Sequence, residues 1–232
     1  MSRGRGGAQG ALDLGTGGAP PPALPEGVRH LPGRLDGTAQ RALVDEVLGL
    51  VGQAGWLEPV MPRSGRPLSV AMCNLGALGW ITDRRGYRYE PVHPLTCRPW
   101  PPIPRLLLDL WEELAGYPHP PECCLVNLYR EGARMGMHQD RDEAELAAPV
   151  LSVSLGDEAV FRVGGRERRE AGVRLPLLSG DVLLMGGPAR LLFHGVDRIM
   201  PGTSPLVPGG GRLNLTLRRV TQPDDGPRTD SG

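Results

Sequence analysis

Three side chains of metal-binding types stand out by their spacing. His138 and Asp140 flank Gln139, and His194 follows much further along the chain. Residues at i and i+2 of an extended backbone point the same way, so the first two can share one ion. Two histidines and one carboxylate are the ligand set of mononuclear non-haem iron(II) sites, which leave coordination positions open for other ligands. The alternative is a solvated turn plus a core histidine, because such a pattern also occurs by chance.

A second polar pattern lies near the C-terminus. The run from Arg212 to Arg218 alternates perfectly, with Arg212, Asn214, Thr216 and Arg218 on one face of a predicted strand and leucines on the other. Such a polar face usually meets solvent, but in a two-sheeted roll it would line a cavity. The two arginines are about 20 Å apart along an extended strand. They would therefore bind one ligand by reaching inward from both sides, which suits a dicarboxylate.

Two further segments carry polar or aromatic groups. Asn127 and Tyr129 share one face of a strand just before the H-x-D run, where a polar co-substrate would satisfy them. Trp80, Tyr87 and Tyr89 lie in a short stretch with several arginines, a combination that suits a stacking platform for a flipped base. The alternative is a hairpin whose aromatic side chains pack on the core.

The elements that must position these residues are mostly strands. Glycine-bearing turns separate period-two runs at residues 124–129, 150–155, 159–163, 173–178, 181–185, 189–194 and 212–220. This pattern predicts an α+β, mostly β fold, a sandwich or jelly roll of antiparallel strands with helices on one outer face. His194 is expected at the end of the strand 189–194.

Two helices are predicted before these strands. The first follows Thr38, a candidate N-cap, and buries Leu43, Val44, Val47, Leu48 and Val51. The second begins near Pro104 and buries Leu106, Leu107, Leu110, Trp111 and Leu114.

The composition places limits on the whole chain. Residues 1–27 are mostly Gly, Pro and Ala and are expected to form a flexible tail, followed by one domain over 28–220 and a second tail over 221–232. The 26 basic and 26 acidic residues balance, so any nucleic-acid partner must be held by local patches. The four cysteines form no C-x-x-C pair and no long apolar run exists, so we expect a reduced, soluble, cytoplasmic protein and a monomer.

Taken together, these motifs closely resemble the AlkB family of 2-oxoglutarate-dependent nucleic-acid demethylases, and the bacterial repair enzymes in particular. The resemblance runs from about Leu68 to Arg218. It rests on Ser69-Val70-Ala71-Met72, Leu78-Gly79-Trp80, Gly86-Tyr87-Arg88-Tyr89, Asn127-Leu128-Tyr129, His138-Gln139-Asp140-Arg141-Asp142, Ser152-Val153-Ser154-Leu155-Gly156, Phe193-His194-Gly195 and the strand 212–218.

The resemblance implies a fold and a role for each motif. The fold would be the double-stranded β-helix, with residues 68–92 as a nucleotide-recognition lid and 123–220 as the catalytic core. The implied iron ligands are His138, Asp140 and His194. The residues implied to bind 2-oxoglutarate are Asn127, Tyr129, Arg212, Asn214 and Arg218. The residues implied to bind substrate are Met72, Trp80, Tyr87, Asp142 and Arg168. Arg168 belongs to a basic cluster with Arg162, Arg166 and Arg169, which could contact backbone phosphates. The alternative is that these arginines lie on a solvated hairpin.

The implied activity is oxidative removal of methyl groups from 1-methyladenine and 3-methylcytosine, using Fe(II), 2-oxoglutarate and O₂ and releasing succinate, CO₂ and formaldehyde. The implied partner is methylated single- or double-stranded DNA, with RNA left open. Two rivals remain: a 2-oxoglutarate dioxygenase acting on RNA, a protein or a small molecule, and a jelly-roll binding module without turnover.

Overall fold

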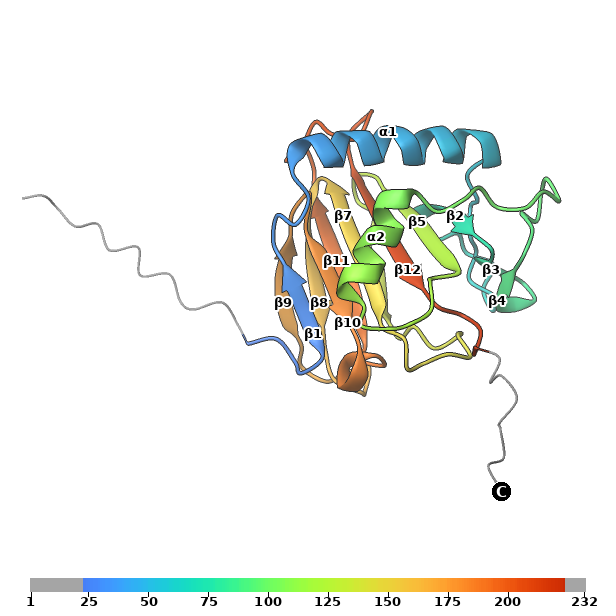
Figure 1. Ribbon diagram of the computed structural model, residues 1–232. Coiled ribbons are helices and arrows are strands. Elements are labelled where there is room, and N and C mark those ends of the chain that lie inside the picture. The colour runs from blue at the N-terminus through green and yellow to red at the C-terminus, as the bar shows by residue number, and fades with distance from the viewer. Residues whose placement is uncertain (1–22, 224–232) are drawn as a thin grey trace, which may run out of the picture.

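The computed structural model describes residues 23–223. Two antiparallel sheets lie face to face (Figure 1). The larger sheet has the order β1 (Val28–Leu31), β10 (Val182–Met185), β7 (Val150–Gly156), β12 (Arg212–Arg218), β5 (Cys123–Tyr129) and β2 (Val70–Gly76). The smaller sheet has the order β6 (Met135–His138), β11 (His194–Met200), β8 (Glu158–Val163) and β9 (Val173–Leu177). This arrangement confirms the predicted, mostly β jelly roll.

Two helices cover the outer face of the larger sheet (Figure 1). They are α1 (Gly37–Ala54) and α2 (Arg105–Leu114). Their apolar stripes, with Val47 and Leu107 fully buried, pack against the alternate residues Leu213, Leu215 and Leu217 of β12. A second apolar cluster fills part of the space between the two sheets. The polar face of β12 is turned toward that space, so the expected alternation is confirmed.

Helix α1 begins differently from the prediction. Asp36, rather than Thr38, is the N-cap, and its carboxylate accepts hydrogen bonds from the backbone N–H groups of Thr38 and Ala39. Both residue types cap helices well, and Gly37 extends the helix toward Asp36. Leu48 and Leu106, expected to be buried, are only partly so.

The expected strand 189–194 is absent. Gly187–Ala189 forms a 3₁₀ turn with Pro188 in its first positions, and the backbone N–H of Leu192 donates to the carbonyl of Ala189. His194 therefore begins β11 instead of ending a strand. An apolar run can be buried as a turn as well as a strand, and the preceding Gly186-Gly187-Pro188 favours the turn.

The predicted lid is divided between two structures. β2 belongs to the larger sheet, paired with β5, whereas β3 (Gly79–Asp83) and β4 (Gly86–Glu90) form a separate hairpin (Figure 1). Thus only the hairpin lies apart from the two main sheets.

The chain ends are described only in part. Residues 1–22 and 224–232, which hold most of the two predicted tails, lie outside the described residues. Residues 23–27 were expected in the first tail, yet Leu24 packs against the core and the carbonyl of Gly27 accepts a hydrogen bond from Gly186. The folded part therefore begins a few residues earlier than expected. Neither helix combines the length and apolar composition needed to cross a bilayer.

Candidate active site

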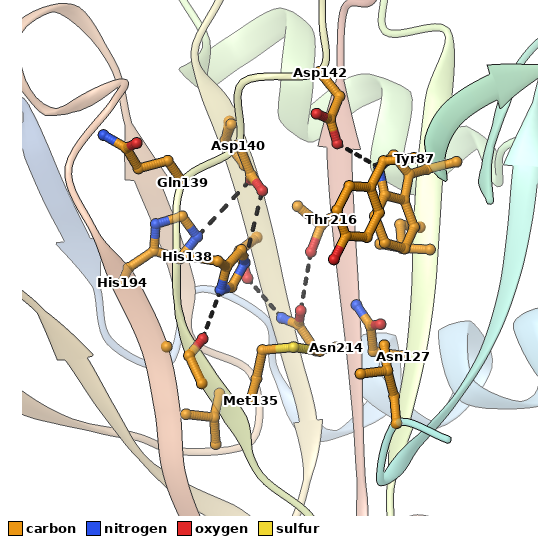
Figure 2. Close-up of a pocket in the computed structure, with 18 of the residues that line it drawn as sticks. Tyr87, Asn127, Met135, His138, Gln139, Asp140, Asp142, His194, Asn214 and Thr216 are labelled. Carbon is orange, nitrogen blue, oxygen red and sulfur yellow. Dashed lines mark hydrogen bonds and ion pairs between the residues drawn. The ribbon is translucent and has the colours of Figure 1, made fainter. Parts of the chain in front are cut away.

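All the residues implied to bind iron, 2-oxoglutarate and substrate line one cavity between the two sheets. Tyr89, the third aromatic of the expected stacking platform, packs against the core instead. The volume of the cavity is about 720 Å³, and strands of both sheets contribute to its wall. His138, Asp140 and His194 converge on one side of it, Asn127, Asn214 and Thr216 lie opposite, and Tyr87 and Asp142 lie at one end (Figure 2). The fold thus brings together segments that are far apart in the sequence.

Two of the three candidate metal ligands lie on strands of the smaller sheet, and the third lies in the segment that follows β6. His138 ends β6, His194 begins β11, and these two residues pair across the sheet. Asp140 lies just beyond β6. The distance from His138 Nε2 to Asp140 Oδ1 is 3.7 Å, and that from His194 Nε2 to Asp140 Oδ2 is 3.9 Å. The ligand atoms of all three lie within 4.8 Å of one another, which suits a single ion.

Hydrogen bonds prepare both imidazole rings for ligation. Nδ1 of His138 lies 2.9 Å from the carbonyl of Gly136, and Nδ1 of His194 lies 3.0 Å from the carbonyl of Leu192. Because a carbonyl only accepts, each Nδ1 must carry the proton. The lone pair of each Nε2 is then free to face the ion, which is the arrangement usual for metal-binding histidines.

The protonation states of His194 and Asp140 also favour metal binding. Burial lowers the pKa of His194 to about 4, which keeps its imidazole neutral near pH 7. Burial opposes ionisation of Asp140, but the attraction and hydrogen bonds of Arg218, together with the neighbouring His194 and His138, outweigh it and hold the pKa of this carboxyl well below its usual range. Arg218 donates to Asp140 Oδ2 through Nη2 at 2.8 Å and Nε at 3.2 Å. A neutral imidazole and an ionised carboxylate are the forms that bind metal.

Arg212 is the strongest indication of an anionic ligand. Its side chain is 1 % exposed, and among residues 23–223 no carboxylate lies within ion-pair distance. It donates to Ser154 Oγ at 2.6 Å, while its Nε has no partner. Burial lowers the pKa of Arg212 to about 10, so the group is still charged near pH 7. A buried charge without a counter-charge is costly, and a ligand carboxylate would relieve that cost.

Other polar groups of the cavity are also available to bind a ligand. Nη1 of Arg218 and Oδ1 of Asn127 are buried and have no hydrogen-bond partner among the described residues. Tyr129 faces the same cavity, and burial raises its pKa to about 12, so its hydroxyl keeps its proton. Together with Arg212, these groups fit a dicarboxylate such as 2-oxoglutarate, bound beside the metal ligands.

Aromatic groups of the hairpin form one wall at the cavity's end. The rings of Trp80 and Tyr87 are stacked, with centroids 5.5 Å apart and planes 15° from parallel. Nε1 of Trp80 donates to Asp142 Oδ2 at 2.9 Å. Tyr87 is 47 % exposed although its ring is large and aromatic. An exposed ring beside a carboxylate acceptor offers a planar ligand both stacking and hydrogen bonding.

The basic cluster is divided by its contacts. Arg168 lines the cavity and donates through Nε and Nη2 to the carbonyl of Met137, next to His138. Arg162 instead pairs with Asp197 at 3.1 Å. Arg166 and Arg169 are exposed. Only Arg168 of this cluster therefore belongs to the cavity.

Several residues in or directly behind the cavity wall were not foreseen as functional. Ser152 and Ser154 of β7 hydrogen-bond to Asn214 and Arg212, and their alternation with apolar residues was a usable signal. Glu143 and Arg190 form a buried ion pair at 3.0 Å, but nothing in the sequence separates them from ordinary surface charges.

Comparison with known proteins agrees with this geometry. Residues 27–218 match the model of the 2OG-Fe(II) oxygenase superfamily. The chain is 61% identical over 189 residues to the alpha-ketoglutarate-dependent dioxygenase AlkB homolog of Caulobacter vibrioides, covering 82% of this chain and 86% of that protein. It is 42% identical over 186 residues to AlkB of Escherichia coli K12, covering 78% and 85%.

A solved structure is similar over most of its length. The structure of OsALKBH1 superimposes with a TM-score of 0.72 at 32% sequence identity, covering 86% of this chain and all of that one. The resemblance seen in the motifs is thus confirmed over the whole folded part. The chain belongs to the AlkB family within the 2OG-Fe(II) oxygenase superfamily, and it is a dioxygenase that requires Fe(II), 2-oxoglutarate and O₂.

Proposed function

We propose that this dioxygenase repairs DNA by removing methyl groups from alkylated bases, with 1-methyladenine and 3-methylcytosine as its substrates. The observation that carries the proposal is the stacked pair Trp80 and Tyr87 beside Asp142, in the same cavity as the metal-binding triad. Enzymes that act on a base must take it out of the stack, and they hold it between aromatic faces with hydrogen bonds to its edge. A methyl group on the pairing edge weakens the base pair and lowers the cost of flipping.

Each part of the cavity has a distinct role in this proposal. His138, Asp140 and His194 hold the iron. Arg212 and Arg218 bind the carboxylates of 2-oxoglutarate, assisted by Asn127, Tyr129 and Asn214. Bound iron with 2-oxoglutarate and O₂ supplies the oxidant that hydroxylates an N-methyl group, and the products are succinate, CO₂, formaldehyde and the restored base.

The protein itself orients the base and its nucleotide in the cavity. Residues 68–92 form the nucleotide-recognition lid, whose Met72 and Trp80 line the cavity with Tyr87. The carboxylate of Asp142 accepts a hydrogen bond from the exocyclic amine of the base. Arg168, held by Met137 beside His138, neutralises charge of the nucleotide at the cavity wall.

A single assay tests this function. The protein is reconstituted with Fe(II) without oxygen, then supplied with O₂, 2-oxoglutarate and a single-stranded oligonucleotide containing 3-methylcytosine. We expect the oligonucleotide to lose one methyl mass, with matching formaldehyde, and the His138→Ala variant to do neither. Release of succinate without demethylation would refute the proposed substrate but not the dioxygenase activity. The same assay with an RNA oligonucleotide shows whether the enzyme acts on DNA, RNA or both.

We also infer that the enzyme works as a cytoplasmic monomer. The cavity is complete within one chain, since every group of the triad and of the 2-oxoglutarate set comes from the same molecule. Light scattering of the purified protein is expected to give the mass of one 24.9 kDa chain. A mass of twice that value would contradict this inference.

A further inference from the structure

Three buried charges, those of Arg190, Glu143 and Arg218, lie directly behind the metal-binding carboxylate of Asp140. Arg190 and Glu143 are 3 % and 6 % exposed, and Asp140 and Arg218 are similarly buried. Glu143 Oε2 accepts from Arg190 Nη2 at 3.0 Å, and Glu143 Oε1 lies 3.4 Å from Arg218 Nε. Arg218 in turn holds Asp140 Oδ2. The two positive and two negative charges balance, so each guanidinium has a carboxylate partner.

Arg190 holds the main chain at the metal site as well. Asp140 lies beyond the end of β6, where sheet hydrogen bonds no longer fix the backbone. Arg190 Nη1 donates to the carbonyl of Asp140 at 2.5 Å, and its Nε donates to the carbonyl of Ala148 at 2.9 Å. Because Arg190 lies just before His194 in the chain, this contact joins the segments that carry two of the three ligands.

The same network reaches the hairpin. The hydroxyl of Tyr89 in β4 donates to Glu143 Oε1. Tyr89 pairs across the hairpin with Trp80, the stacking residue. Burial raises the pKa of Tyr89 well above its usual value, so the hydroxyl remains a donor. An unbroken chain of contacts therefore runs from the hairpin through Glu143 to Arg190 and Arg218, and from both arginines to Asp140.

We propose that Arg190 and Glu143 are positioning residues, which hold Asp140 in place against His194 and tie the hairpin β3–β4 to the same ligand. Arg190 lines no part of the cavity, so it acts through Asp140 and Glu143. Removing it leaves the carbonyl of Asp140 without its donor and Glu143 with one buried partner fewer. Substitution of a residue that holds a metal ligand in place commonly lowers the metal affinity in this way.

Manganese binding tests the metal half of the proposal without turnover. Mn(II) is titrated into metal-free wild type, Arg190→Met and Arg29→Met, with free Mn(II) followed by electron paramagnetic resonance. Arg29→Met is the control for loss of an arginine far from the ligands, because Arg29 is exposed, donates to a backbone carbonyl, that of Leu114, and lies outside the cavity. We expect about tenfold weaker Mn(II) binding for Arg190→Met and wild-type affinity for Arg29→Met.

Melting temperatures separate positioning from a merely structural role. A lower melting temperature with unchanged Mn(II) affinity in Arg190→Met would overturn the metal half of the proposal. If Arg190→Met does not fold, Glu143→Gln and Arg190→Lys are titrated in its place. Wild-type affinity in both of these folded variants would overturn it equally.

The Tyr89→Phe variant tests the link to the hairpin, which rests on the proposed function. It removes one hydroxyl, and we expect more succinate per formaldehyde than in wild type, with Mn(II) affinity unchanged. An unchanged ratio would overturn the hairpin half. If wild type itself releases no formaldehyde from the methylated oligonucleotide, the proposed function fails, whereas the Mn(II) titration still decides the role of Arg190.

Discussion

The residue that most clearly requires a ligand is Arg212, a buried guanidinium without a carboxylate partner in the described part of the chain. We expect Arg212→Met to abolish most 2-oxoglutarate binding, because a hydrogen bond to a charged group contributes about 1.5–3 kcal/mol. A ligand that binds only the native state raises the melting temperature. With Mn(II) present, 2-oxoglutarate should therefore stabilise wild type and leave the variant unchanged. An equal rise in both proteins would exclude Arg212 from the 2-oxoglutarate site.

The four cysteines differ sharply in accessibility. Cys97 is exposed, whereas Cys73, Cys123 and Cys124 are buried. Burial raises the pKa of Cys73 to about 11 and that of Cys123 to about 12. Only the thiolate reacts with iodoacetamide, so a raised pKa slows alkylation; at pH 8 about one Cys73 in a thousand is ionised.

We therefore expect native protein at pH 8 to gain one iodoacetamide adduct, located at Cys97 by mass spectrometry. The Cys97→Ser variant should gain none, and urea-unfolded protein should gain an adduct at every cysteine. Rapid alkylation of a second thiol in the native state would show that the larger sheet opens readily around β2 and β5.

At the scale of single residues, the sequence predicted the functional residues whose spacing places several polar side chains on one face of a strand. His138, Asp140 and the polar face of β12 were found because their spacing sets their direction. Glu143 and Arg190 were not found, because a buried ion pair depends on long-range packing that spacing does not encode. Asp142 was expected to bind substrate, but its hydrogen bond with Trp80 was visible only in three dimensions.

At the scale of elements, alternation was a reliable guide where both sides of a strand had distinct surroundings. β12 lies inside the larger sheet, with helices behind its leucines and the cavity before its polar side chains, and its pattern predicted both faces. The run 189–194 was predicted to be a strand, but it is buried as a 3₁₀ helix and turn, which its short apolar pattern does not distinguish from a strand. The shift matters because His194 occupies the first position of β11, directly across from His138.

The close approach of β6 and β11 depends on Gly195. A Cβ at this position would lie 2.6 Å from the carbonyl oxygen of Met135 and 3.1 Å from Gly136. Gly195→Ala must therefore push the two ligand-bearing strands apart, and we expect Mn(II) affinity to fall about tenfold or more. Gly136→Ala is the matched control, since its methyl group meets nothing within 4 Å. Equal Mn(II) affinity in the two variants would show that strand spacing does not set the metal site.

At the scale of the whole molecule, the larger sheet separates two regions with different tasks. The helices α1 and α2 form an apolar layer on one face (Figure 1). The cavity lies on the other face. The residues of the first region were predictable as periodic apolar stripes. The arrangement of the hairpin over the cavity was not, because it depends on contacts between segments distant in sequence, such as Tyr89 with Glu143.

This layering allows stability to be changed without changing activity. Gly49 is exposed in the interior of α1, and an added methyl group there would meet nothing within 4 Å. Gly49→Ala should raise the free energy of unfolding by about 0.5–1 kcal/mol, because alanine loses less backbone entropy in a helix. Gly55, the C-cap of the same helix, has φ +96°, so Gly55→Ala should destabilise the protein instead. Urea unfolding measures both effects, and succinate release should stay at the wild-type rate in Gly49→Ala. A clear loss of activity in this stabilised variant would mean that α1 reaches the cavity through the sheet, contrary to the separation of the two regions.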